Sequence, residues 1–169
     1  MFHIVLGFTI VIGVGLGAGP QLVSEGSAVV TDSDTETEAT ARDWQPEPQT
    51  PTGKFTTATE VKPILTATKT AWAALREYDG KDLLYFTHLV AWRCGLHEIQ
   101  FSVNNAALQV FEVEECYTDT AQPNAMKMET HMPYVSYDLG SVNSVTVTLI
   151  YDDASTDRAE FLRKEILMP

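Results

Sequence analysis

Residues 83–116, LLYFTHLVAWRCGLHEIQFSVNNAALQVFEVEEC, decide the fold of this chain. The stretch is rich in aromatic and β-branched side chains, which favour strands. It is interrupted by a Cys-Gly pair at 94–95 and an Asn-Asn pair at 104–105. Both pairs suit tight turns between antiparallel strands. The stretch therefore predicts a three-stranded antiparallel meander whose first strand covers residues 83–92.

The two cysteines of the chain, Cys94 and Cys116, belong to the second half of this stretch. If the Asn pair forms a two-residue turn, Cys94 lies opposite Glu115 and diagonal to Cys116. If the turn takes one more residue, the two cysteines face each other directly. Either register brings the sulfur atoms close to disulfide geometry, and an exported chain with two cysteines is expected to pair them. We therefore predict a Cys94–Cys116 disulfide.

One histidine of the stretch has a carboxylate across the predicted sheet. In the register of the two-residue turn, His97 lies opposite Glu112, and we interpret them as a polar pair on the surface. The alternative is a His-carboxylate dyad in a small hydrolase of unrecognised type. The sequence holds no Gly-x-Ser-x-Gly motif and no phosphate-binding glycine loop. No catalytic residue is therefore assigned.

A cluster of soft side chains follows the second cysteine. Three of the five methionines and one histidine fall within seven residues, as Met126, Met128, His131 and Met132. The first interpretation is packing, in which flexible methionines fasten a loop to the sheet. The alternative is a copper site, because thioethers and imidazole are ligands that suit copper. Copper is the one cofactor that the sequence points to, and only through this loop.

Local signals before the stretch predict a short helix and a hairpin. Thr57 and Glu60 have the spacing of a capping box at the start of a helix that ends before Lys69. Residues 70–78 predict a strand, with a helix as the alternative. The Asp-Gly pair at 79–80 is a strong hairpin signal.

Signals after the stretch predict more strands. Residues 134–139 and 142–151 have strand composition, and residues 158–168 fit either an edge strand with Ala159 and Phe161 facing inward or a terminal helix. The expected fold class is mainly β. We predict an antiparallel β-sandwich or β-roll with one short N-terminal helix and one intrachain disulfide.

The N-terminal third differs from the rest in composition. Residues 4–18 are almost entirely apolar but shorter than the roughly 20 residues of a spanning helix, which predicts a signal peptide over 1–28 or, as the alternative, a retained signal anchor. Residues 29–53 are acidic and rich in Thr and Pro, which predicts a disordered linker. Residues 54–169 form a single predicted β-rich domain.

The net charge of the chain limits the kinds of molecule that it can bind. The formal net charge is −12, and Lys and Arg form no cluster, so nucleic acid is excluded as a partner. We expect an exported, periplasmic or extracellular protein that touches the membrane only through an uncleaved N-terminal segment. The predicted function is a non-enzymatic binding or accessory domain of the cell envelope whose partner is a protein or an envelope component. A copper-binding accessory protein and a small hydrolase are the alternatives.

Overall fold

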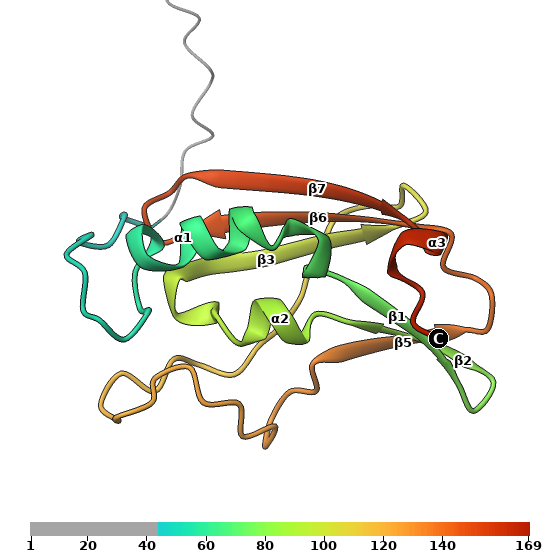
Figure 1. The fold of residues 1–169 in the computed structure, drawn as a ribbon, viewed down its shortest axis with the longest axis horizontal. Coiled ribbons are helices and arrows are strands. Elements are labelled where there is room, and N and C mark those ends of the chain that lie inside the picture. The colour runs from blue at the N-terminus through green and yellow to red at the C-terminus, as the bar shows by residue number, and fades with distance from the viewer. Residues whose placement is uncertain (1–43) are drawn as a thin grey trace, which may run out of the picture. The chain divides into compact units, whose positions relative to one another are not determined.

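Two antiparallel sheets form the described part of the chain, residues 44–169 of a computed structural model (Figure 1). One sheet has the order β1-β2-β5 and the other the order β4-β3-β6-β7, and they do not join into a barrel. The strands are β1 (Ala74–Tyr78), β2 (Lys81–Tyr85), β3 (Leu96–Val103), β4 (Gln109–Val110), β5 (Tyr134–Asp138), β6 (Ser144–Tyr151) and β7 (Thr156–Leu162). The predicted fold class, mainly β with antiparallel sheets and one disulfide, is confirmed.

Short helices flank the sheets. They are α1 (Ala58–Ala67), α2 (Thr87–Val90), α3 (Arg163–Ile166) and the 3-10 turns η1 (Lys69–Ala71) and η2 (Arg93–Gly95). The predicted first helix is confirmed, since α1 begins after Thr57 and ends before Lys69. Its apolar side buries Val61 and Leu65 in the core, and Lys62 lies 5.1 Å from the ring centre of Tyr151 on β6.

The Asp-Gly pair makes the predicted hairpin between β1 and β2. Asp79 and Gly80 have positive φ values of 49° and 71°, which a two-residue turn of this type requires. Strand β1 begins only at Ala74, because the preceding residues form the turn η1. The predicted strand over 70–78 is therefore correct in its second half, and the helical alternative holds for part of the first.

The predicted meander is wrong in its first strand. Strand β2 ends at Tyr85 and pairs with β1 and β5, while β3 pairs with β4 and β6. Residues 86–95 turn through α2 and η2. The buried positions Phe86, Leu89, Val90 and Arg93 have helical spacing. In residues 86–92 an alternating pattern has apolar side chains on both faces. The sequence therefore fits the two-residue period of a strand and the 3.6-residue period of a helix equally well.

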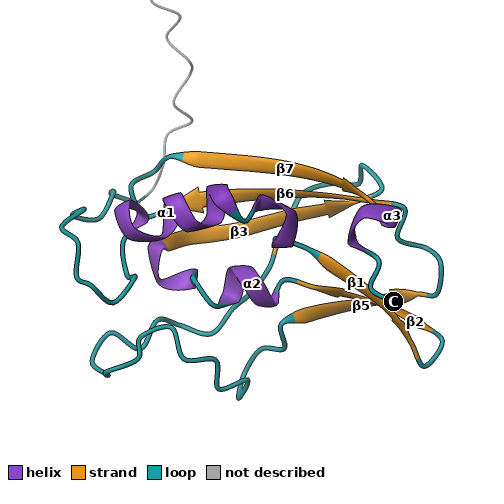
Figure 2. Ribbon diagram, viewed as in Figure 1, coloured by secondary structure: helices purple, strands orange, loops and turns teal. Residues whose placement is uncertain are grey.

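The Asn-Asn turn is confirmed. Asn104 and Asn105 both have positive φ, and the Ala106 N–H donates to the carbonyl of Val103 at 3.0 Å. Strand β4 pairs with β3 in the longer of the two predicted registers, because Gln100 lies opposite Val110. β4 is two residues long, and a loop without helix or strand then runs over residues 111–133 (Figure 2).

The C-terminal segment combines both predicted alternatives. Strand β7 pairs with β6 from Ser144 to Ile150 and buries Ala159 and Phe161, as an inward-facing edge strand should. The chain then turns into α3 at Arg163. After that helix, the Met168 N–H donates to the carbonyl of Leu75 on β1 at 2.7 Å.

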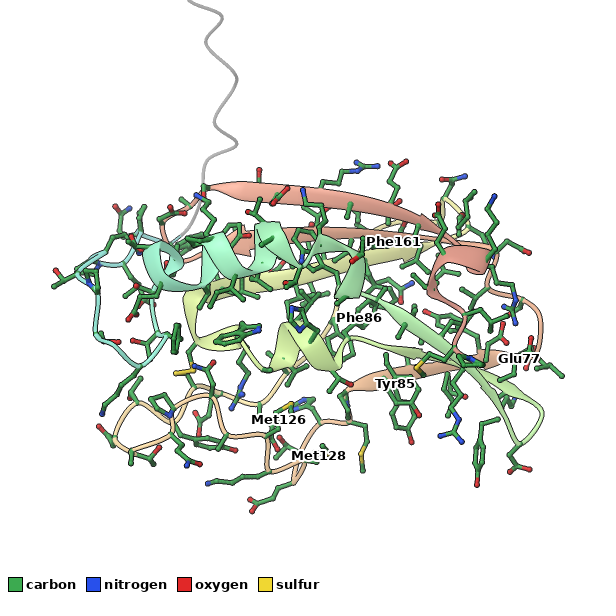
Figure 3. The ribbon with its side chains drawn as sticks, viewed as in Figure 1. Glu77, Tyr85, Phe86, Met126, Met128 and Phe161 are labelled. Atoms are coloured by element: carbon green, nitrogen blue, oxygen red, sulfur yellow. A yellow bond between two sulfur atoms is a disulfide. The ribbon has the colours of Figure 1, made fainter. Side chains whose placement is uncertain are left out.

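The core lies between the two sheets and under α1. Phe86 (Figure 3) is fully buried in it, and its ring centroid lies 5.0 Å from that of Phe101 and 4.8 Å from that of Phe111. Trp72 is fully buried and donates its indole N–H to the carbonyl of Leu65 at 2.9 Å. Aromatic contacts therefore bring together β3, the residue that precedes α2 and the start of the long loop.

The described residues begin inside the predicted linker. Asp152 receives a hydrogen bond from the side chain of Gln49 at 2.7 Å, and its carbonyl accepts the Glu47 N–H at 2.8 Å. Residues 44–53 thus pack on the domain instead of forming a disordered tether. The predicted signal peptide and the rest of the linker lie outside the described residues. None of the helices within 44–169 has the length and apolar character needed to span a bilayer.

Candidate functional site

The disulfide ties the long loop to the start of β3. Cys94 on η2 and Cys116 are bonded, with their Cα atoms 5.2 Å apart, as predicted. The bond holds residues 111–116 beside β3 although the β4 ladder stops at Val110. A disulfide of this kind is typical of proteins that fold in an oxidising compartment.

Arg93 forms a second clamp beside the disulfide. Its side chain is buried, and its guanidinium donates to the carbonyls of Glu114 at 2.7 Å and Ala125 at 2.9 Å. Further bonds reach the carbonyls of Val90, Glu115 and Asn124. Burial lowers the pKa of Arg93, and the nearby Glu114 carboxylate acts in the opposite direction. Arg93 therefore joins three segments of backbone.

Glu114 holds the next part of the loop. Its two carboxylate oxygens accept the backbone N–H groups of Lys127 at 3.0 Å and Glu129 at 2.8 Å. Burial raises the pKa of Glu114, but these two hydrogen bonds and the charge of Arg93 outweigh it and keep the pKa below its ordinary value. The carboxylate thus fixes the backbone around residues 127–129.

A cleft of ≈820 Å³ lies where β3, the disulfide and the segment before α1 meet. We call it the acidic cleft. Its lining includes five glutamates, namely Glu47, Glu98, Glu112, Glu114 and Glu115. Arg93 is the one Lys or Arg among the described residues that line it, and its guanidinium is directed to backbone carbonyls. The volume is that of a site for a small ligand or a short peptide segment.

His97 and Glu112, the predicted polar pair, both reach the acidic cleft but do not lie opposite each other in the sheet. Both His97 and Glu112 line the acidic cleft. The observed register, extended from Gln100 opposite Val110, puts Val113 instead of Glu112 across from His97. The His97 ring stacks on Trp44, with centroids 3.6 Å apart and planes 13° from parallel. The stack positions this histidine, and it also fixes the fold-back of residue 44 onto the domain.

The soft cluster comes together at a second, much smaller cavity. Met126, Met128, His131 and Met132 all line a cavity of ≈10 Å³, which we call the methionine cavity. Figure 3 shows Met126 and Met128 close together on the loop below α2. Met126 packs against the core, whereas Met128 and Met132 are about half exposed. Packing against the core therefore explains the position of Met126 but leaves Met128 and Met132 without such a role.

Sequence reasoning missed Arg93 and Glu114, the two residues that organise the loop. A signal for Arg93 was present, since it is a lone charge inside the apolar run 89–96 and neighbours a disulfide cysteine. A buried charge requires partners. Glu114 had no comparable signal, because it is one acid among several neighbours.

Histidine 88 behaves as a boundary residue of the core. Its Nε2 lies 2.7 Å from the Thr68 hydroxyl, and burial lowers its pKa. Among residues 44–169, no group of three or more His, Cys, Asp or Glu side chains is placed to hold a metal ion.

Comparison with known proteins identifies no relative. No protein-family model matches the chain, and neither the curated proteins nor the solved structures include a match.

Proposed function

We propose that this chain is an exported, non-enzymatic binding domain of the cell envelope that binds a basic peptide segment of a partner protein in the acidic cleft. The observation that carries the proposal is the charge of the lining, which holds five glutamates and one arginine; Glu114 and Arg93 are both bonded internally, and the other four glutamates remain. A concave site with one sign of charge attracts ligands of the opposite sign and raises their association rate.

Two features support a binding role over chemistry. The cleft is built on a rigid frame, since the disulfide and Arg93 fix its wall at residues 114–116. Its histidine is stacked on Trp44, whereas an acid-base role requires a partner within hydrogen-bond reach. The disulfide supports export, and the proposed location is the periplasm or the outside of the cell.

The proposal is tested by calorimetric titration of the full chain with a short peptide rich in Lys and Arg. A peptide of the same length with Gln in place of the basic residues is the comparison. We expect saturable binding of the basic peptide alone, weakening with added salt because the charges are screened. Equal binding of the neutral peptide would contradict the proposal.

Exchange of cleft glutamates makes the test specific. The variant Glu47→Gln with Glu115→Gln removes two exposed charges from the lining. Each change should weaken binding about two- to fivefold, the effect of one partly exposed ion pair. The control Glu160→Gln removes an exposed charge on β7, outside the cleft. An equal loss in the control would mean that net charge, not the cleft, drives binding.

A further inference from the structure

The methionine cavity has the size of a single atom or ion. Its volume of ≈10 Å³ is close to the minimum for one water molecule and too small for an organic ligand. The apolar part of the lining consists of the three methionines, Val90, Val113 and Pro133, and its polar residues are His131, Glu112 and Glu114.

The donor atoms at this cavity are soft. Two glutamates also line it, and both carboxylate oxygens of Glu114 already accept backbone N–H groups, which leaves Glu112 as a single carboxylate donor. Both cysteines are consumed by the disulfide. Thioether sulfur is therefore the soft donor that remains, and hard ions such as Ca²⁺ or Mg²⁺ would find too few oxygen ligands.

We propose that the methionine cavity binds one Cu(I) ion through the thioethers of Met126, Met128 and Met132 and the imidazole of His131. Thioether and imidazole ligands suit Cu(I). A binding site in an oxidising compartment also benefits from methionine ligands, because cysteine thiolates there pair into disulfides.

The surrounding structure positions these ligands in advance. The two hydrogen bonds to Glu114 come from Lys127 and Glu129, which flank Met128 on either side. Arg93 holds the carbonyl of Ala125, next to Met126, at 2.9 Å. The loop backbone that carries two of the ligands is thus tied to the disulfide wall.

The imidazole of His131 has a hydrogen-bond partner on one of its two ring nitrogens. Its Nδ1 lies 2.9 Å from the Thr130 hydroxyl. When Nδ1–H donates there, the lone pair of His131 is on Nε2. Metal-binding histidines commonly use their second ring nitrogen in this way, which fixes the tautomer and the orientation of the ring.

The site is tested by anaerobic titration of the full chain with Cu(I) against a chelator of micromolar affinity for Cu(I). We expect the protein to withdraw one equivalent of Cu(I), and X-ray absorption of the complex to show sulfur ligation. The triple variant Met126→Leu, Met128→Leu, Met132→Leu keeps the side-chain volume and removes the sulfur atoms. It should lose more than about 100-fold in affinity, beyond the effect of changing an outer partner.

Two further variants separate loss of the copper site from loss of the fold. Met168→Leu changes a partly exposed methionine outside the cavity and should bind Cu(I) like the wild type. Met132 is 55% exposed, so Met132→Leu alone tests the site without risk to the fold if the triple variant unfolds. It should weaken binding at least tenfold.

Three results would overturn the site: failure of the wild type to compete with a chelator of even micromolar affinity, unchanged affinity in the folded leucine variants, or an equal loss in Met168→Leu. Peptide binding by the acidic cleft should be unaffected by all of these substitutions. The copper site and the proposed function therefore fail independently.

Discussion

At the scale of single residues, one buried ion pair joins the two sheets. Asp82 on β2 is fully buried and accepts two hydrogen bonds from the Arg163 guanidinium, at 2.6 Å and 2.9 Å. The Val142 N–H donates to the same carboxylate at 3.1 Å. Arg163 starts α3 directly after β7, so the pair links the three-stranded sheet to the end of the four-stranded one.

Removing Arg163 should strongly destabilise the folded protein. Arg163→Met leaves the Asp82 carboxylate buried and unpaired, and we expect the free energy of unfolding at neutral pH to fall by about 3–5 kcal/mol. Arg158→Met is the control, because the pair of Arg158 with Glu160 is exposed and should contribute less than about 1 kcal/mol. Urea denaturation of both variants measures the difference, and equal small losses would show that the buried pair is not a stabilising link.

The same pair predicts how stability depends on pH. The Arg163 hydrogen bonds, opposed by burial and aided by the Val142 N–H, lower the pKa of Asp82 to about 2. A carboxyl with a depressed folded pKa stabilises the protein above its unfolded pKa of about 3.9. That contribution, about 2 kcal/mol, should be lost as the pH falls from 4 towards 2. Urea denaturation over this range should show a shallower loss in Arg163→Met than in the wild type.

At the scale of elements, α1 packs against η2 through a glycine. A Cβ atom on Gly95 would lie 2.5 Å from a methyl carbon of Val61 and 2.7 Å from the carbonyl oxygen of Thr57. The second contact is with backbone, so the helix itself would have to move.

Overpacking at this contact should destabilise the fold. Gly95→Ala is expected to lower the free energy of unfolding by about 1–3 kcal/mol, measured by urea denaturation. Thr66→Ala on the exposed side of the same helix should be neutral or slightly stabilising, since alanine is the better helix former. A neutral Gly95→Ala would mean that α1 and η2 are not in rigid contact.

At the scale of the whole molecule, the disulfide closes a loop over a sequence separation of 22 residues. Replacing both cysteines by serine should reduce the free energy of unfolding by about 3 kcal/mol, because the unfolded chain regains freedom. Mass measurement after alkylation without reduction should detect no modified thiol in exported protein. Two alkylated cysteines would refute both the bond and the oxidising compartment inferred from it.

Several local features of this molecule followed from the sequence alone. Four features depend on residues that are near one another in the chain: the Asp-Gly turn, the Asn-Asn turn, the helix after Thr57 and the strand β6. Positive φ at Asp79 and Asn104 is a short-range steric preference, so it is readable without the fold. The disulfide was also predictable, because either hairpin register brought its two cysteines together.

The pairing of the sheets and the make-up of the candidate sites were decided by the tertiary structure. Residues 86–95 carry apolar side chains at both strand and helix periods, and only burial of Phe86 against Phe101 and Phe111 selects the helix. Long-range contacts of Arg93 and Glu114 likewise close the acidic cleft and gather the methionines. The chain by itself thus determined its local turns, its main strands and its covalent link. The tertiary structure decided which segments became neighbours. That choice depends on side-chain packing between residues distant in sequence, and a local sequence pattern holds no information about such packing.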